Sequence, residues 1–229
     1  MSGEPVLALQ GVRRAFDGGR VVALQDINVV IHPGEHVAVT GPSGCGKSSL
    51  LQLLGALDEP DAGEARFCGK TLVGAAARSR FRARNVGFVF QSFHLLPTLT
   101  ALENVQIPMF EMPWPRCERR QRADALLREV GLAERLQHLP CEMSGGERQR
   151  GAAARSLANQ PLVILADEPT GNLDSASAAR VLELLSRMHL ERGTALVVAT
   201  HDPGVARRAQ RIITLCDGRI LSDGPSSSP

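Results

Sequence analysis

The sequence contains no apolar run long enough to cross a membrane. A spanning helix needs roughly 18 or more consecutive, mainly apolar residues, and no uninterrupted run in the 229 residues approaches that length. The first residues also lack the basic start and long apolar stretch of a signal peptide. We therefore expect a soluble protein that reaches any membrane through a partner.

Closely spaced cysteine pairs are missing as well. The chain has five cysteines, but no two form a CxxC pair, and an odd number argues against a disulfide framework or a zinc site. The expectation is reduced thiols in a cytosolic protein. Cys45 is the exception to follow, because it lies in a glycine-rich loop.

Lysine is scarce, and the net charge is small. Only Lys47 and Lys70 are lysines among the 26 basic residues, which leaves 24 arginines. A lysine kept in so arginine-rich a chain suggests a use for its compact ammonium group. The formal net charge of +2 gives no reason to expect nucleic acid or an acidic membrane surface as the main partner.

Strand and helix patterns alternate in the first and last parts of the chain, which predicts a mostly parallel α/β sheet. The expected strands of this sheet are 36–40, 86–90, 162–166, 195–199 and 212–215, with helices at 48–57 and 175–190. Two further strands at 6–8 and 27–31, with a turn at 17–19 between them, indicate an N-terminal sheet.

The middle of the chain has a different pattern. Residues 92 to about 160 are mainly helical; Thr100 to Glu103 form a capping box, and a charged amphipathic helix covers 116–130. We interpret residues 1–224 as one domain whose core (about 1–91 and 161–222) carries an inserted helical subdomain (about 92–160). The Ser/Pro-rich tail, residues 225–229 with Gly224 before it, is expected to be disordered.

Residues 41–48 match the phosphate-binding P-loop pattern G-x-x-x-x-G-K-[ST]. Such a loop points several backbone N–H groups at phosphate oxygens, and the next helix presents its positive N-terminal end. Lys47 is expected to reach the β- and γ-phosphates, and Ser48 to bind Mg²⁺. The alternative is a glycine-rich turn that happens to precede a helix. The residues predicted to contact nucleotide here are Gly41, Pro42, Ser43, Gly44, Cys45, Gly46, Lys47, Ser48 and Ser49.

Two carboxylates follow the apolar run 162–166. A buried strand that ends in Asp167 holds this carboxylate at the carboxyl edge of the sheet, where ligands bind in open α/β sheets. Asp167 is the predicted Mg²⁺ residue, and Glu168 is the predicted general base for the attacking water. A solvated acidic loop is the alternative interpretation.

The stretch 143–150, Met-Ser-Gly-Gly-Glu-Arg-Gln-Arg, distinguishes between P-loop families. It resembles the signature of the ABC ATPases, although Ser144 to Glu147 is also a capping box that starts a helix. The resemblance implies that this signature contacts the γ-phosphate of ATP held by a second copy, so that a homodimer forms on ATP binding. The signature residues assigned to nucleotide are Ser144, Gly145, Gly146 and Glu147.

Other ABC landmarks occur in the family's order. The resemblance makes Phe16 the adenine-stacking aromatic, Gln91 the Q-loop residue that senses Mg²⁺ and the partner, and His201 the switch histidine. Asp174 ends the D-loop 171–174. The plainer alternatives are a core Phe16, a helix-capping Asp174 and a surface or core His201. Catalytic roles are thus expected for Glu168, His201, Lys47 and Gln91, and Mg²⁺ binding for Ser48, Gln91 and Asp167.

The resemblance extends over nearly the whole chain, from about residue 6 to 221. Its finer pattern is similar to the lipoprotein-releasing and macrolide-export ATPases, and the segments 87–91, 94–97, 99–105, 144–150 and 166–174 carry it. Met143, Ser49 and Gly151 depart from the usual residues but remove no catalytic group.

This resemblance implies an α/β P-loop NTPase fold of the ABC type with an N-terminal antiparallel β-subdomain and an inserted helical subdomain. It implies an Mg-ATP hydrolysing subunit on the cytoplasmic face of the inner membrane. It would power a separate integral membrane permease for export or lipoprotein extraction, with no nucleic acid partner. A signalling or cell-division motor that transports nothing is the main alternative. Soluble ABC proteins acting on ribosomes or DNA usually carry two cassettes or a long insertion, which this chain lacks.

Overall fold

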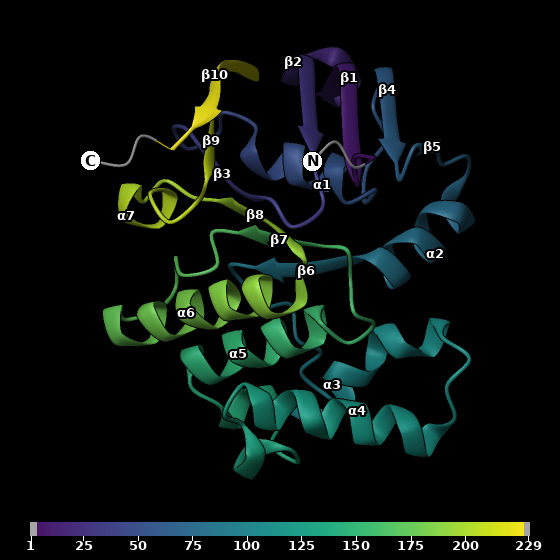
Figure 1. Cartoon of the computed structure of the whole chain (residues 1–229), viewed down its shortest axis with the longest axis vertical. Coiled ribbons are helices and arrows are strands. Elements are labelled where there is room, and N and C mark those ends of the chain that lie inside the picture. Colours follow the sequence, from purple (N-terminus) through teal and green to yellow (C-terminus); the bar gives the residue numbers. More distant parts are fainter. Residues whose placement is uncertain (1–3, 227–229) are drawn as a thin grey trace.

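The computed structural model describes residues 4–226, and its strands form two sheets (Figure 1). The first sheet is antiparallel, in the order β2-β1-β4-β5. A single 3-10 turn, η1 (Asp17–Gly19), joins its first two strands, as the sequence predicts. The strands of this sheet are β1 (Leu7–Phe16), β2 (Val21–Ile31), β4 (Ala62–Phe67) and β5 (Lys70–Thr71).

The second sheet has the order β10-β9-β3-β8-β7-β6. All its neighbouring strands are parallel except β10, which pairs antiparallel with β9. This confirms the predicted mostly parallel sheet, and three predicted strands match in their bounds. The strands are β3 (His36–Thr40), β6 (Val86–Phe90), β7 (Val163–Asp167), β8 (Ala195–Ala199), β9 (Arg211–Cys216) and β10 (Arg219–Pro225).

Helices cover both faces of the second sheet. They are α1 (Lys47–Leu54), α2 (Ala75–Asn85), α3 (Ala101–Gln106), α4 (Arg116–Glu129), α5 (Gly145–Ser156), α6 (Ser175–Arg192) and α7 (Pro203–Ala206). Short 3-10 segments η2 (Ile107–Glu111), η3 (Ala133–Arg135) and η4 (Pro140–Glu142) connect them. In the described range 4–226, no helix has both the length and the hydropathy that a membrane span requires.

The core forms two layers, because α1 lies between the two sheets while α3 to α6 lie on the other side of the second sheet (Figure 1). β7 shows the consequence. Val163 and Leu165 pack into the layer that contains α1, and Ile164 and Ala166 pack into the layer that contains α5 and α6. A strand buried on both faces has no polar side, which explains its uninterrupted apolar sequence.

Parallel pairing brings four segments to one edge. Val39 pairs with Ala199, Ala199 with Asp167, and Asp167 with Phe90. The residues that follow these strand ends are therefore neighbours, although they are far apart in the sequence. Ligands bind at this carboxyl edge in open α/β sheets.

Several elements were not predicted, and one expectation is wrong in part. The missed elements are β4, β5, α2, α7 and β10. Gly224 and Pro225 were expected to be disordered, but they lie in β10, opposite Ile212 and Arg211. Pairing with β9 supplies hydrogen bonds that the Ser/Pro-rich composition does not reveal. Residues 227–229 of the expected tail lie outside the described residues.

Candidate nucleotide site

The P-loop takes a backbone conformation that requires glycine. Gly41, Gly44 and Gly46 have φ values of +144°, +80° and +107°, a region that side chains disfavour. A Cβ atom at Gly41 would collide with the carbonyl oxygen of Leu215, and one at Gly46 would lie 2.5 Å from that of Ala23. The loop is therefore packed tightly against both sheets on its inner side.

Lys47 holds its charge within this loop. Its Nζ donates hydrogen bonds to the carbonyl oxygens of Gly41 at 2.8 Å and Pro42 at 2.9 Å, and the residue is only 8% exposed. Within residues 4–226, no carboxylate lies within ion-pair distance of this ammonium group. A buried cation without an ion-paired carboxylate fits a site that receives an anion.

The Cys45 side chain packs beside Gly41 of the same loop, since a Cβ atom at Gly41 would lie 2.7 Å from the Cys45 sulfur. The side chain is buried in the hydrophobic cluster between the sheets, and its carbonyl oxygen accepts a hydrogen bond from Gly218 N–H at 3.1 Å. Its contact with nucleotide stays a prediction. All five cysteines are free thiols in the structure.

Asp167 and Ser48 meet beneath the loop. The Ser48 hydroxyl lies close enough to the Asp167 carboxylate to lower its pKa, and the Oδ1 atom of Asp167 is buried with no hydrogen-bond partner in the described part of the chain. Burial raises the pKa of Asp167, and the charge of Glu168 adds to this shift, whereas the Ser48 hydroxyl and the charge of Lys47 oppose it. An orphaned buried carboxylate oxygen beside a hydroxyl fits a site for a hard cation such as Mg²⁺.

Glu168 and His201 form the next pair along this edge. Glu168 Oε1 lies 2.8 Å from His201 Nδ1. The carboxyl side chain is 16% exposed, whereas the imidazole is 67% exposed. Glu168 has a φ of +45°, and its N–H donates to the Ala199 carbonyl at 2.9 Å. A left-handed backbone at a non-glycine residue is strained, and such strain often marks functional sites.

Hydrogen bonds join the segments that follow β6 and β7. Asn172 Nδ2 donates to the Gln91 carbonyl at 3.1 Å, and Gln91 Nε2 donates to Asn172 Oδ1 at 3.4 Å. Gly171 permits this contact, because a Cβ atom there would lie 2.7 Å from Gln91 Nε2. No hydrogen bond in residues 4–226 joins Gln91 to Ser48 or Asp167, so its metal role stays a prediction.

The structure also decides between readings of two other residues. Phe16 is 37% exposed, with the Arg14 guanidinium 4.8 Å from its ring centre; the core alternative is therefore wrong. Asp174 caps α6 by accepting a hydrogen bond from Ser177 N–H at 3.0 Å, so the capping reading is confirmed. The adenine and D-loop roles of these residues stay predictions.

The signature stretch begins α5 with the predicted capping box. Glu147 N–H donates to Ser144 Oγ at 3.2 Å, and Ser144 N–H donates to Glu147 Oε2 at 2.8 Å. This second hydrogen bond is the main reason that the pKa of Glu147 is lowered. Gly146 lets α5 approach α6, since a Cβ atom would lie 2.8 Å from Ser177 Oγ. No hydrogen bond joins 144–147 to 41–49 within the described chain.

Gln149 and Arg155 support the site and were not predicted. The buried Gln149 amide donates to the carbonyls of Pro169 at 2.7 Å and Phe90 at 3.3 Å, so α5 holds the ends of β6 and β7. Arg155 donates to the carbonyls of Phe93, at 2.9 Å, and His94. The sequence did contain a signal for Gln149: it is a polar residue four positions before Ala153, and so lies on the same, buried face of α5.

Comparison with known proteins identifies the family. The family model described as "ABC transporter" matches residues 24–171. The lipoprotein-releasing system ATP-binding protein LolD of Pseudomonas fluorescens is 45% identical over 97% of this chain and 100% of its own length. The macrolide export ATP-binding/permease protein MacB of Sodalis glossinidius is 48% identical over 96% of this chain, which spans only 34% of that relative.

Solved structures agree with this. A dimeric, post-hydrolysis ATP-binding cassette, MJ0796, bound to ADP and Pi, has a TM-score of 0.90 and 39% identity, with coverage of 97% of this chain and 100% of that one. The cbiO1 protein of Clostridium perfringens, part of the transporter complex cbiONQ, has a TM-score of 0.86 and 27% identity, with coverage of 98% and 90%. The chain belongs to the ABC transporter family of ATP-binding proteins.

Proposed function

We propose that this chain is the ATP-hydrolysing subunit of an ABC transporter and drives a separate membrane permease for export or lipoprotein extraction. The observation that carries the proposal is the meeting, at one sheet edge, of the Lys47 loop, the Ser48–Asp167 pair and the Glu168–His201 pair. LolD and MacB are named for lipoprotein release and macrolide export. This chain spans 34% of the length of that MacB and 100% of that LolD.

The P-loop would bind the triphosphate. Its backbone N–H groups and the N-terminus of α1 offer partial positive charge to the anion. Two N–H groups of the Lys47 ammonium donate to the loop carbonyls, and the third is left to donate to a phosphate oxygen. Positioning and charge stabilisation would supply most of the rate, as is usual for phosphoryl transfer.

Glu168 would accept the proton of the attacking water. Its contact with His201 Nδ1 holds the carboxylate in one orientation, and the exposed imidazole leaves Nε2 available to the γ-phosphate side of the site. For Mg²⁺, the fitting residues are Ser48 and Asp167, with Gln91 as a third candidate. When bound, the ion would neutralise charge on the β- and γ-phosphates.

A second copy would complete each nucleotide site. In the described part of the chain, Ser144 and Gly146 make no hydrogen bond to the P-loop, and MJ0796 was solved as a dimer. We infer a head-to-tail dimer in which each ATP lies between the P-loop of one copy and residues 144–147 of the other. Closure would be a population shift that ATP favours and hydrolysis reverses.

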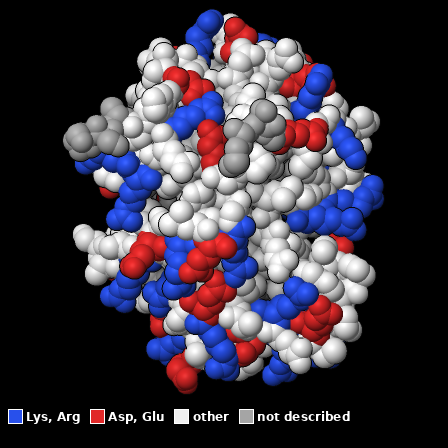
Figure 2. Space-filling model, viewed as in Figure 1, with Lys and Arg blue, Asp and Glu red and all other residues white. Residues whose placement is uncertain are grey.

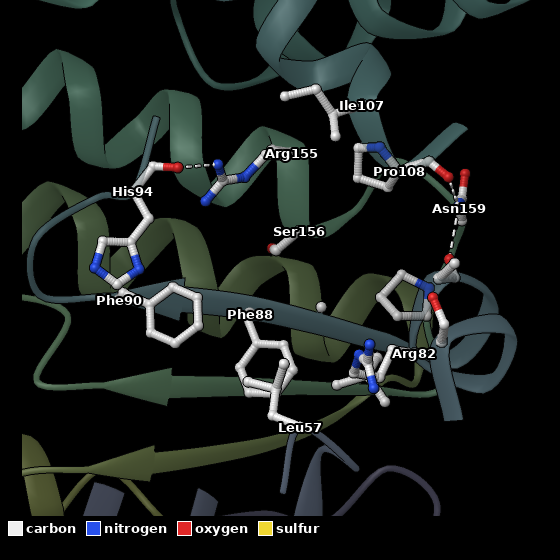
Figure 3. Close-up of a pocket in the computed structure, with 15 residues that line it drawn as sticks. Leu57, Arg82, Phe88, Phe90, His94, Ile107, Pro108, Arg155, Ser156 and Asn159 are labelled. Atoms are coloured by element: carbon white, nitrogen blue, oxygen red, sulfur yellow. Dashed lines mark hydrogen bonds between the residues drawn. The ribbon is translucent and has the colours of Figure 1, made fainter. Parts of the chain in front are cut away.

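The permease would dock in a groove between α2, β6, η2 and α5 (Figure 3). Its volume is about 400 Å³, and its lining is mostly apolar; Phe88, Phe90 and Pro108 line it together with Arg82. Arg155 also lines the groove and holds the carbonyls of the segment just after Gln91. A segment seated here would therefore sense movements of Gln91, and it would hold the chain on the cytoplasmic face of the membrane.

The deciding experiment is recovery of the tagged chain from native membranes in mild detergent with ATP. A polytopic membrane protein should be recovered with it. The Phe88→Ser variant, altered in the groove, should lose this partner and keep ATP binding. Recovery of the chain alone, or together with ribosomes or DNA, would contradict the proposal.

A further inference from the structure

Charge is divided unevenly along the chain. The stretch from 65 to 102 holds six of the 26 basic residues and none of the 24 acidic residues. The remainder, with 20 basic and 24 acidic residues, is net negative. The small overall charge therefore conceals a strongly basic segment. Its members are Arg66, Lys70, Arg78, Arg80, Arg82 and Arg84.

Helix α2 carries four of these arginines in two roles. Arg78 pairs with Glu59, and Arg82 donates to the Ala56 carbonyl at 2.6 Å, so these two fasten the helix. Arg80 and Arg84, one turn apart, are exposed. Within residues 4–226, no carboxylate lies within ion-pair distance of either one. Figure 2 shows basic side chains gathered over the side where α2 lies in Figure 1.

A second basic group lies across the groove, beyond η2. Phe110 is 67% exposed, and the Arg119 guanidinium lies 4.6 Å from its ring centre. Both line a cavity of about 440 Å³ together with Arg116 and Arg120. In the described chain, none of these three arginines is ion-paired. Arg119 donates a hydrogen bond to the Trp114 carbonyl at 2.7 Å, and its Nε atom is buried without a partner. Glu103 also borders the cavity, and its Oε2 atom accepts both capping-box hydrogen bonds from Thr100.

We propose that these two rims, Arg80 and Arg84 on α2 and Phe110 with its arginines, contact anionic lipid headgroups of the membrane. Guanidinium groups bind phosphate in a bidentate manner, and exposed apolar residues such as Phe110 and Val73, 85% exposed, suit the headgroup boundary. This lipid proposal rests on the proposed function in one respect only, namely that the groove faces the membrane.

Helix geometry favours lipid over an acidic segment of the permease. The part of α2 that lines the groove is Ser79, Arg82 and Ala83. Around the helix, Arg80 is turned by about 100° and Arg84 by about 140° from Ser79, so both point away from the groove. A peptide seated in the groove would leave both arginines uncovered, whereas a flat anionic surface lying over both rims would reach them.

The test is flotation of the purified chain with vesicles, which needs no permease. Vesicles of phosphatidylcholine mixed with phosphatidylglycerol should bind the protein, vesicles of phosphatidylcholine alone should not, and added salt should weaken binding. Each basic residue near such a surface changes binding about fivefold. The Arg80→Gln/Arg84→Gln variant should therefore lose at least about tenfold in affinity.

The matched control is Arg207→Gln/Arg208→Gln, an exposed pair at the end of α7, which lies across the molecule from α2 (Figure 1). This variant should bind the anionic vesicles as the unmodified chain does. Equal losses in the two variants, or no preference for anionic vesicles, would overturn the proposal.

Permease recovery separates the remaining outcomes. If Arg80→Gln/Arg84→Gln binds vesicles normally but fails to recover the permease, the arginines serve a protein partner and the lipid proposal is wrong. If vesicle binding is lost as expected while no permease is ever recovered with the unmodified chain, the proposed function fails and the lipid contact stands.

Discussion

At the scale of single residues, the site depends on charges that folding alone leaves unsatisfied. In residues 4–226, Lys47 is buried with no carboxylate within ion-pair distance, and Asp167 has a buried oxygen without a hydrogen-bond partner. Each is costly until a ligand of opposite charge arrives. The same features that make the empty site less stable therefore make it selective for phosphate and a cation.

Replacing Asp167 by Asn should separate stability from function. The pKa of Asp167 is raised on folding, chiefly by burial. The ionised carboxylate therefore opposes folding at a pH above the folded-state pKa. This penalty is lost as the pH falls through the folded-state pKa to the lower pKa of the unfolded chain. Asp167→Asn should therefore raise the melting temperature of the ligand-free chain at neutral pH, but not in acid, and should abolish hydrolysis.

The control is Asp124→Asn. The Arg128 hydrogen bond lowers the pKa of Asp124, so its carboxylate favours folding at neutral pH and the substitution should not stabilise the chain. A lower neutral-pH melting temperature for Asp167→Asn would contradict the account of its buried carboxylate.

Glu168→Gln should bind ATP but hydrolyse it at least about a hundredfold more slowly, because the amide cannot accept a proton. The chain should then accumulate as an ATP-bound dimer, measured by size-exclusion chromatography with and without ATP. Lys47→Ala serves as the comparison, since it should weaken ATP binding itself. Normal turnover by Glu168→Gln would remove Glu168 from the role of base.

At the scale of elements, glycine positions decide how closely strands and helices approach. A Cβ atom at Gly87 in β6 would collide with the carbonyl oxygen of Ser156 at the end of α5. Gly151, inside α5, has no atom nearer than 3.8 Å to its Cβ position, and its φ is not positive. One glycine is required by packing, and the other only weakens its helix.

The two glycines should respond in opposite directions to alanine. Gly87→Ala should lower the free energy of unfolding by about 1 to 3 kcal/mol, through forced separation of β6 and α5. Gly151→Ala should raise it by up to about 1 kcal/mol, through helix propensity. Urea unfolding of both variants measures the difference. Equal effects would show that the close approach at Gly87 is not limiting.

At the scale of the whole molecule, the signature must act on another copy. Ser144 caps its own helix with its hydroxyl and has no hydrogen bond to the P-loop of the same chain. Asp is as good a helix cap as Ser, but it would place a negative charge against the partner's γ-phosphate. The substitution therefore preserves α5 while opposing dimer closure.

In the Glu168→Gln background, Ser144→Asp should leave ATP binding to the single chain intact and abolish the ATP-dependent dimer. Thr100→Asp is the matched control, because Thr100 caps α3 with the same kind of capping box and lies outside the predicted dimer contacts. Light scattering with ATP distinguishes the two variants. Dimerisation of the Ser144→Asp variant as in its parent would contradict the composite site.

The sequence by itself determined the elements whose signals are local. The capping boxes at Thr100 and Ser144, the P-loop at 41–48 and the doubly buried strands were all readable, because each depends on a few adjacent residues. These same signals carried the resemblance to ABC ATPases. They placed the candidate residues correctly at the ends of predicted strands.

Only the tertiary structure decided what depends on contacts between distant residues. The burial of the Cys45 side chain, the hydrogen bonds of Gln149 and the pairing of Pro225 in β10 each need a partner remote in sequence. The basic rims were hidden in the same way, because a net charge of +2 says nothing about where the charges lie. Folding brings α2 and η2 to the same groove. This arrangement depends on tertiary packing, which the local sequence pattern does not reveal.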